Sequence, residues 1–118
     1  MKDVNATKKF ALQIRIEAIN MMYQHGFGHV GGSLSIADAM AVLYQDEMKY
    51  DPKDPKWDGR DYLVMSKGHC GPALYSALAL KGFFPVEELK QHYANGSRLS
   101  GHVSHKGVPG VDVSTGSL

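Results

Sequence analysis

The stretch that most constrains the fold of this chain is YLVMS, residues 62–66. It is an unbroken apolar run between a turn-rich segment, residues 49–61, and a glycine-containing loop, SKGHCGP, residues 66–72. Such a run is typical of a strand that is covered on both faces in a parallel sheet. A strand of this kind needs neighbouring strands to pair its backbone groups. Residues 62–66 therefore predict a parallel sheet and an α/β architecture.

Most other apolar residues recur at helical spacing. Four helices are predicted, at residues 4–25, 35–48, 72–81 and 85–96. The second is expected to begin at Ser35, because Ser35 and Asp38 together resemble a capping box. Val111 and Val113 are candidates for a second short strand. Four helices with so little sheet do not close an α/β domain, so the chain is expected to be part of a larger fold or to pair with another chain.

Composition excludes several functional classes. The 118 residues suffice for one small domain, and 13 basic against 12 acidic residues leave a net charge of +1 without any block of like charge. Neither a nucleic acid nor an anionic membrane is therefore an expected partner. A single cysteine, Cys70, excludes an internal disulfide and fits a reducing compartment. With no long apolar run and no secretory signal, a cytoplasmic protein is expected.

His69 lies between two glycines, where the predicted strand gives way to a helix. Parallel α/β sheets bind ligands at the carboxyl ends of their strands, and a helix N-terminus preceded by glycine attracts phosphates. Pro72 removes one backbone donor there, and the His69 side chain can replace it. Gly68 and Gly71 would let a ligand approach the backbone closely. The alternative is a tight turn in which His69 caps a local group.

Two further histidines are flanked by glycine, His29 in GFGHVGG and His102 in SGHVSHKG. Together with His69 they suggest a common site, because histidine exchanges protons near neutral pH. A zinc site at His102 and His105 is disfavoured, since neither HExxH nor CxxC is present. The STGSL segment, residues 114–118, is either a phosphate-cradling turn or an ordinary connector.

Three stretches, in this order, carry a resemblance to a known family: GHVGGSLSIADAMAVLY, DPKWDGRDYLVMSKGHCGPALYSALALKG and LSGHVSHKGVPGVDVSTGSL. They resemble the start of transketolase, and more closely the N-terminal subunit of the split transketolases of bacteria and archaea. The resemblance runs from about Lys9 to Leu118. It implies that residues 1–118 are the N-terminal part of a thiamine diphosphate-binding domain, incomplete at the C-terminus. The implied fold is a partial doubly wound α/β fold, helix-rich, with an incomplete parallel sheet.

The resemblance also implies a cofactor and the residues that serve it. The cofactor would be thiamine diphosphate, held with magnesium or calcium. His69 would contact its diphosphate, while His29 and His102 would bind substrate oxygens and transfer protons. The implied backbone contacts to the cofactor come from Gly116, Ser117 and Leu118. The family continues with GQG and GDG motifs that this chain lacks, so the metal ligands are expected outside it.

The implied activity is transfer of a two-carbon ketol unit between sugar phosphates, as in the pentose phosphate pathway. The partners would be a C-terminal transketolase subunit or domain in a homo- or hetero-oligomer, and the 118-residue chain alone is expected to be inactive. The loop reads GHVG where the family usually has GHPG, a change common among split subunits. Two alternatives stay open. One is another thiamine diphosphate enzyme, such as deoxyxylulose phosphate synthase, and the other is a non-catalytic interaction fragment or degenerate paralogue.

Overall fold

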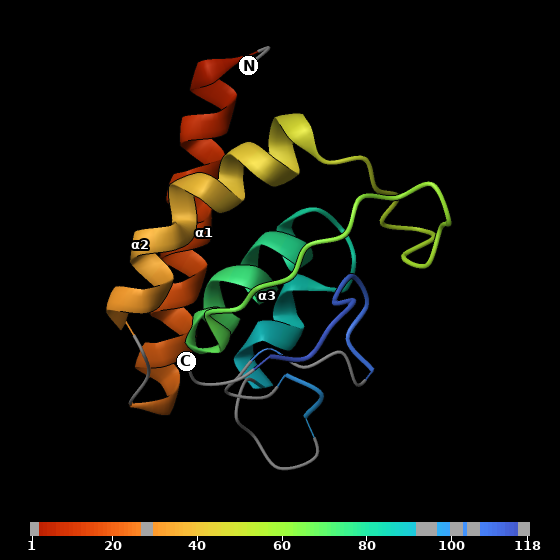
Figure 1. Cartoon of the computed structure of the whole chain (residues 1–118). Helices are drawn as coiled ribbons and strands as arrows, with labels where there is room; N and C mark the ends of the chain where they lie inside the picture. The colour runs from red at the N-terminus through yellow and green to blue at the C-terminus, as the bar shows by residue number, and fades with distance from the viewer. Residues whose placement is uncertain (1–2, 27–29, 92–96, 100–102, 104–106, 116–118) are drawn as a thin grey trace.

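The regular structure of the chain is helical throughout the part that the computed structural model describes, residues 3–26, 30–91, 97–99, 103 and 107–115. In chain order, the elements are α1 (Val4–His25), α2 (Val30–Val42), a π-helical turn η1 (Leu43–Glu47), a 3₁₀ turn η2 (Gly68–Cys70), α3 (Gly71–Leu80) and a 3₁₀ segment η3 (Val86–Gln91) (Figure 1). None of the helices in these ranges has the length and apolarity needed to cross a bilayer.

Helix α1 has the bounds and the buried face that its periodicity predicts. The Asp3 carboxylate accepts a hydrogen bond from the Ala6 N–H at 3.0 Å and caps the first turn. Gly26 ends the helix with φ +76°, the left-handed conformation that glycine adopts without steric cost. The buried face includes Phe10, Ile14, Ala18 and Met21, as predicted, together with Thr7, Ala11 and Met22. It packs against α2 and α3, so this helix forms one wall of the core.

The prediction for the second helix is wrong at its start. Helix α2 begins at Val30, five residues before the predicted position, so Ser35 and Asp38 lie inside it and form no capping box. Asp38 instead pairs with Arg15 of α1 at 2.9 Å. Glycine has a low helix propensity, and the helix nevertheless includes Gly31 and Gly32. A Cβ atom at Gly32 would face Lys67 and Cys70, so this part of the helix packs against η2. The helix ends in η1, where the Met48 N–H donates to the Leu43 carbonyl at 2.8 Å.

Helix α3 lies in the centre of the molecule, beside the α1–α2 pair (Figure 1). Its residues are buried on every side, from Gly71 through Ala79. A helix that is apolar all round is stable only when it is surrounded. Pro72 occupies the first turn, where its missing N–H costs nothing, and Gly82 stops the helix with φ +91°. The predicted range 72–81 is thus confirmed to within a residue at each end.

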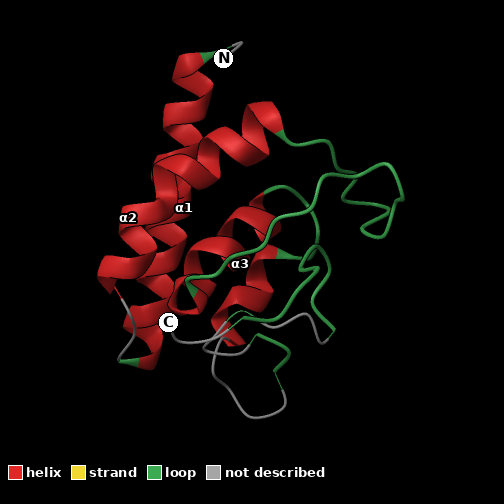
Figure 2. Ribbon diagram, in the orientation of Figure 1, coloured by secondary structure: helices red, strands yellow, loops and turns green. Residues whose placement is uncertain are grey.

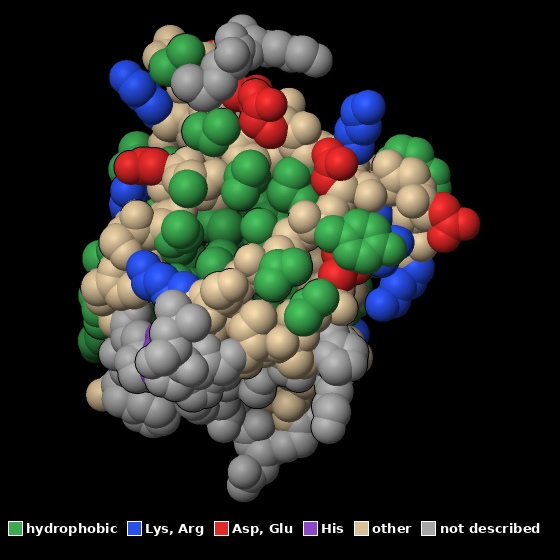
Figure 3. All heavy atoms as spheres, in the orientation of Figure 1, with side chains coloured by type: hydrophobic (Ala, Val, Ile, Leu, Met, Phe, Trp, Pro, Cys, Tyr) green, Lys and Arg blue, Asp and Glu red, His purple; other side chains and the backbone are tan. Residues whose placement is uncertain are grey.

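The predicted strand at 62–66 is not a strand within the described residues, where no strand occurs (Figure 2). The segment is extended, and its side chains alternate. Met65 is buried in the core that contains α3, whereas Tyr62 and Val64 are 61% and 56% exposed. They are not the only exposed hydrophobic side chains, since Figure 3 shows others, drawn in green, on one face of the molecule. A strand is defined by pairing, and no described segment supplies a partner, so the sheet stays a prediction.

The two remaining predictions near the C-terminus also need correction. Val111 and Val113 belong to no strand, since Val111 is buried and Val113 exposed in an irregular segment. The predicted helix at 85–96 is instead the 3₁₀ segment η3 as far as Gln91, and residues 92–96 lie outside the described part. Leu89 is the only buried residue in η3, so a single side chain anchors it. One anchor does not give the apolar stripe that stabilises an amphipathic helix.

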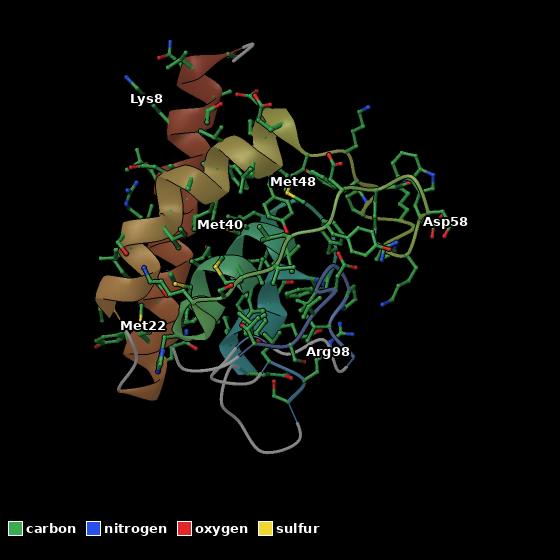
Figure 4. All side chains as sticks on the ribbon, viewed as in Figure 1. Lys8, Met22, Met40, Met48, Asp58 and Arg98 are labelled. Atoms are coloured by element: carbon green, nitrogen blue, oxygen red, sulfur yellow. The ribbon has the colours of Figure 1, made fainter. Side chains whose placement is uncertain are left out.

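Residues 49–61 form the consecutive turns that their Asp–Pro and Asp–Gly pairs predict. Three turns follow each other at three-residue intervals, each closed by a backbone hydrogen bond of 3.0–3.2 Å. Asp58 lies at the outer end of this loop, away from the helices (Figure 4). The base of the loop is closed where the Asp61 N–H donates to the Lys49 carbonyl at 2.7 Å and the Lys49 N–H donates to the Asp61 carboxylate at 2.7 Å.

A pair of isoleucines in α1 tests this description of the core. Ile14 is fully buried, and Ile16, on the same helix, is 56% exposed. We expect Ile14→Ala to lower the free energy of unfolding by about 2–5 kcal/mol, because it leaves a cavity. The matched control Ile16→Ala should change it by less than about 0.5 kcal/mol. Chemical denaturation followed by circular dichroism measures both, and equal losses would show that α1 presents another face to the core.

Candidate functional site

The site begins at η2, the single turn that joins the extended segment to α3. His69 lies in this turn and is half-buried, and α3 starts two residues later, as the sequence predicts. The Cys70 N–H donates to the Lys67 carbonyl at 3.0 Å and fixes the turn. Neither η2 nor the first turn of α3 contains an acidic residue. The positive end of the α3 dipole is therefore not neutralised by a carboxylate of its own first turn.

Two backbone hydrogen bonds connect η2 to the C-terminal loops. The Val103 N–H donates to the Gly68 carbonyl at 3.1 Å, and the Thr115 N–H donates to the Val103 carbonyl at 2.9 Å. Val103 is buried, so these bonds are shielded from water. Val103 directly follows His102, and Thr115 directly precedes Gly116. Main-chain hydrogen bonds thus connect the segment of His69 to the segment that follows His102, and connect that segment to the one that precedes Gly116.

The first turns of α2 lie against the other side of η2. The Cys70 thiol donates to the Gly32 carbonyl at 3.2 Å, and the Lys67 ammonium donates to the Ser35 hydroxyl at 2.9 Å. A Cβ atom at Gly32 would lie 3.5 Å from Cε of Lys67, an ordinary contact distance. Helix α2 follows directly after the GHVGG histidine in the sequence. All four glycine-containing motifs therefore have described residues that meet around one turn.

Not every predicted site residue belongs to the described part of the chain. His69 does, and its position at the start of α3 is confirmed. The others lie outside the described residues, so their roles stay predictions: His29, His102, Gly116, Ser117 and Leu118.

Gly68 and Gly71 are both buried, and a close approach of a ligand to their backbone stays a prediction. The carbonyl of Gly68 accepts a hydrogen bond from the Val103 N–H. Of the η2 residues, His69 is the one that is not fully buried.

Two buried hydroxyls near these segments were not found from the sequence. Thr115 Oγ1 and Ser33 Oγ are inaccessible to water and have no hydrogen-bond partner among the described residues. Leaving a buried polar group unpaired costs about 1–3 kcal/mol. The Thr115 N–H donates to the Val103 carbonyl, and Gly116 is the next residue in the chain. The hydroxyl of Thr115 therefore marks a place beside these segments where a polar partner is missing. Its position beside Gly116 in STGSL was the only signal in the sequence, and Ser33 had none.

The burial of Cys70 decides how reactive its thiol is. Cys70 is fully buried, and this burial raises the pKa of its thiol, an effect that the nearby Lys67 only partly opposes. The thiol therefore stays protonated near neutral pH and is a poor nucleophile. The described residues contain no group of three or more His, Cys, Asp or Glu side chains placed to hold a metal ion.

Comparison with known proteins agrees with this arrangement. The chain is 55% identical over 93 residues to the 6-deoxy-6-sulfo-D-fructose transketolase subunit SqwG of a Clostridium strain, covering 79% of this chain and 34% of that protein. It is 43% identical over 104 residues to one of the apulose-4-phosphate transketolase subunits of Phocaeicola vulgatus, covering 88% of this chain and 37% of that protein. The chain thus spans about a third of these relatives.

Solved structures agree as well. The transketolase of Pichia stipitis in complex with sedoheptulose-7-phosphate is 38% identical, with a TM-score of 0.90 over 96% of this chain and 17% of that one. The transketolase of Leishmania mexicana is 37% identical, with a TM-score of 0.89 over 95% of this chain and 17% of that one. The family model of the transketolase thiamine diphosphate-binding domain matches residues 6–118. The chain therefore belongs to the transketolase family and lies within its thiamine diphosphate-binding domain.

Proposed function

We propose that residues 1–118 form the diphosphate-binding part of an enzyme that transfers a two-carbon ketol unit from a ketose phosphate to an aldose phosphate. One observation carries this proposal. The hydrogen bonds from Val103 to Gly68 and from Thr115 to Val103 join the segments of three predicted site residues at the start of one helix. A merely structural turn does not require two distant loops to end against it.

The chemistry of η2 suits a diphosphate. The first N–H groups of α3 have no partners within the helix and attract anions. His69 adds a side-chain donor beside them. Lys67, directly before η2, adds an ammonium group, and η2 contains no acidic residue that would neutralise it. The unpaired hydroxyl of Thr115 offers a further donor at the end of the hydrogen-bonded chain. These groups fit an anion with several acceptor oxygens, as thiamine diphosphate is.

The remaining roles follow from family membership and are part of the proposal. Thiamine diphosphate, when bound, supplies the carbon nucleophile that accepts the ketol unit. His69 holds its diphosphate, and His29 and His102 donate hydrogen bonds to substrate oxygens and transfer protons near neutral pH. Gly116, Ser117 and Leu118 contact the cofactor through backbone groups.

Magnesium or calcium accompanies the cofactor in this proposal, and we assign the ion no ligand among the described residues. The two bacterial relatives are named as transketolase subunits, which supports an assembly with a C-terminal subunit or domain. We place this assembly in the cytoplasm as part of the proposal. Their names also give a sulfonated ketose and a ketose phosphate as substrates. A transfer assay of the assembled enzyme with both kinds of ketose therefore tests the reaction and its donor, and no transfer from any anionic ketose would refute the proposal.

Alanine substitutions at His69 and His29 separate the two proposed roles in the assembled enzyme. A hydrogen bond to a charged group is worth about 1.5–3 kcal/mol, so His69→Ala should weaken cofactor affinity by that amount. Its turnover at saturating cofactor should change little, since the contact to the diphosphate is equal in ground and transition states. His29→Ala should lower turnover by about 10²–10⁴, as for a general acid–base group, with cofactor affinity almost unchanged.

Cofactor titration of each variant, followed by rate measurement at saturation, gives both quantities. The wild-type enzyme is the reference, and His69→Gln serves as the control that keeps a donor. If His69→Ala binds cofactor normally and loses turnover, or His29→Ala loses cofactor affinity, the two loops have been assigned the wrong roles.

Thr115 provides an independent test, because its hydroxyl is buried and unpaired among the described residues. Thr115→Val keeps the shape and removes the hydroxyl, so the cofactor-free enzyme should be as stable as the wild type or slightly more stable. Cofactor affinity should fall by about 0.5–3 kcal/mol, the range for a lost hydrogen bond to a neutral or charged group. Thr115→Ser, which keeps the hydroxyl, should bind normally. Thermal unfolding and calorimetry measure the two effects, and unchanged affinity in Thr115→Val would remove this residue from the site.

A further inference from the structure

An arginine–aspartate pair joins the two chain segments that lead into the site. Nη2 of Arg60 lies 2.8 Å from Oδ1 of Asp112, and Nε of Arg60 donates to the same oxygen at 3.1 Å. The two side chains are only 10% and 9% exposed. The residues are 52 positions apart in the sequence, so the pair is a tertiary connection and not a local one.

The guanidinium of Arg60 is held on two further sides. Its Nη1 donates to the Trp57 carbonyl at 2.8 Å, within the last turn of the 49–61 loop. Its Cζ lies 4.2 Å from the ring centroid of Tyr62, a distance typical of a cation–π contact. Arg60 is therefore fixed in orientation, and the nearby carboxylate further raises the pKa of a group that is already always charged. Asp112 faces a rigid and permanent positive charge.

Asp112 is fixed from its own side by Gly110. Gly110 has φ +94°, and a Cβ atom there would lie 2.7 Å from Cδ2 of Leu78 and 2.8 Å from Cδ1 of Phe83. The backbone is thus pressed onto the end of α3, closer than any other residue allows. Val111, next along the chain, is buried. Gly110 and Val111 therefore anchor the backbone directly before Asp112.

The position of the pair relative to the site gives it a role. Arg60 precedes the extended segment that leads to η2 and His69, and Asp112 lies three residues before Thr115. Arg60 therefore lies at the start of the segment that leads to η2, and Asp112 lies at the start of the segment that leads to Thr115. Val103 hydrogen-bonds to the far end of each of these segments. The salt bridge closes one end of this connection, and the backbone hydrogen bonds close the other.

We propose that Arg60 and Asp112 are positioning residues for the cofactor site, which hold the turn at His69 and the segment that ends at Thr115 at the separation that one diphosphate requires. This inference rests on the proposed function. Neither side chain needs to contact the cofactor. Without the pair, the turn and the segment must be ordered by the cofactor itself, and binding becomes weaker by the free energy of that ordering.

The test uses the assembled enzyme and the double variant Arg60→Met/Asp112→Leu, which removes both charges and so leaves no unpaired charge behind. We expect its dissociation constant for thiamine diphosphate to rise at least about tenfold, with turnover at saturating cofactor within about twofold of wild type. The cofactor-free double variant should keep a cooperative unfolding transition. The matched control is Arg15→Met/Asp38→Leu, which removes the α1–α2 ion pair away from these segments and should bind cofactor as the wild type does.

Arg60→Lys provides a second measurement if the double variant does not fold. Lysine keeps the charge but not the rigid fork, so the dissociation constant should rise while the fold is retained. Normal cofactor affinity in a folded double variant, or in Arg60→Lys, would overturn the positioning role and leave the pair a structural contact only. A wild-type enzyme that does not bind thiamine diphosphate would instead refute the proposed function, so the two failures are distinguishable.

Discussion

The burial of α3 on all sides is the constraint on which the rest of the described structure depends. Its residues from Gly71 through Ala79 are all buried, and the helix contacts both α1 and α2. A helix enclosed in this way has no freedom to shift along its axis without opening cavities. Its first turn is therefore fixed in space, and with it the position of η2 and His69. The packing of α3 therefore also fixes the N–H groups of its first turn, which form part of the proposed anion site.

The helices could be predicted from the sequence to the extent that each depends on its own periodicity. Helix α1 shows a clear apolar face and a glycine cap, and its predicted range is confirmed. The start of α2 could not be predicted, because Gly31 and Gly32 have low helix propensity and the contacts of Gly32 are with Lys67 and Cys70, which are distant in the sequence. The strand at 62–66 is a different case. Pairing belongs to two segments at once, and one apolar segment contains no information about where its partner lies.

The position of His69 just before α3 could also be predicted, because Pro72 and the flanking glycines mark the start of that helix in the sequence. How the motifs are joined could not. The hydrogen bonds of Val103 use main-chain atoms, which every residue possesses, so no side chain reveals them. The Arg60–Asp112 pair lies across a separation of 52 residues, with no periodicity connecting its partners. Thr115 has an ordinary side chain, and only its burial distinguishes it. Sequence patterns predict groups with special chemistry, whereas the contacts that position them depend on the folded chain.

The extended segment at 62–66 has a consequence for the time course of folding. The contacts of α1 with α2 connect neighbouring parts of the chain, and such contacts form early. The segment is then held against α3 by Met65, while Tyr62 and Val64 face outward beside backbone groups without a strand partner among the described residues. An exposed edge of this kind pairs with whatever strand reaches it first, including that of another copy of the chain. Self-association of the chain at this segment is therefore favoured by high protein concentration during folding.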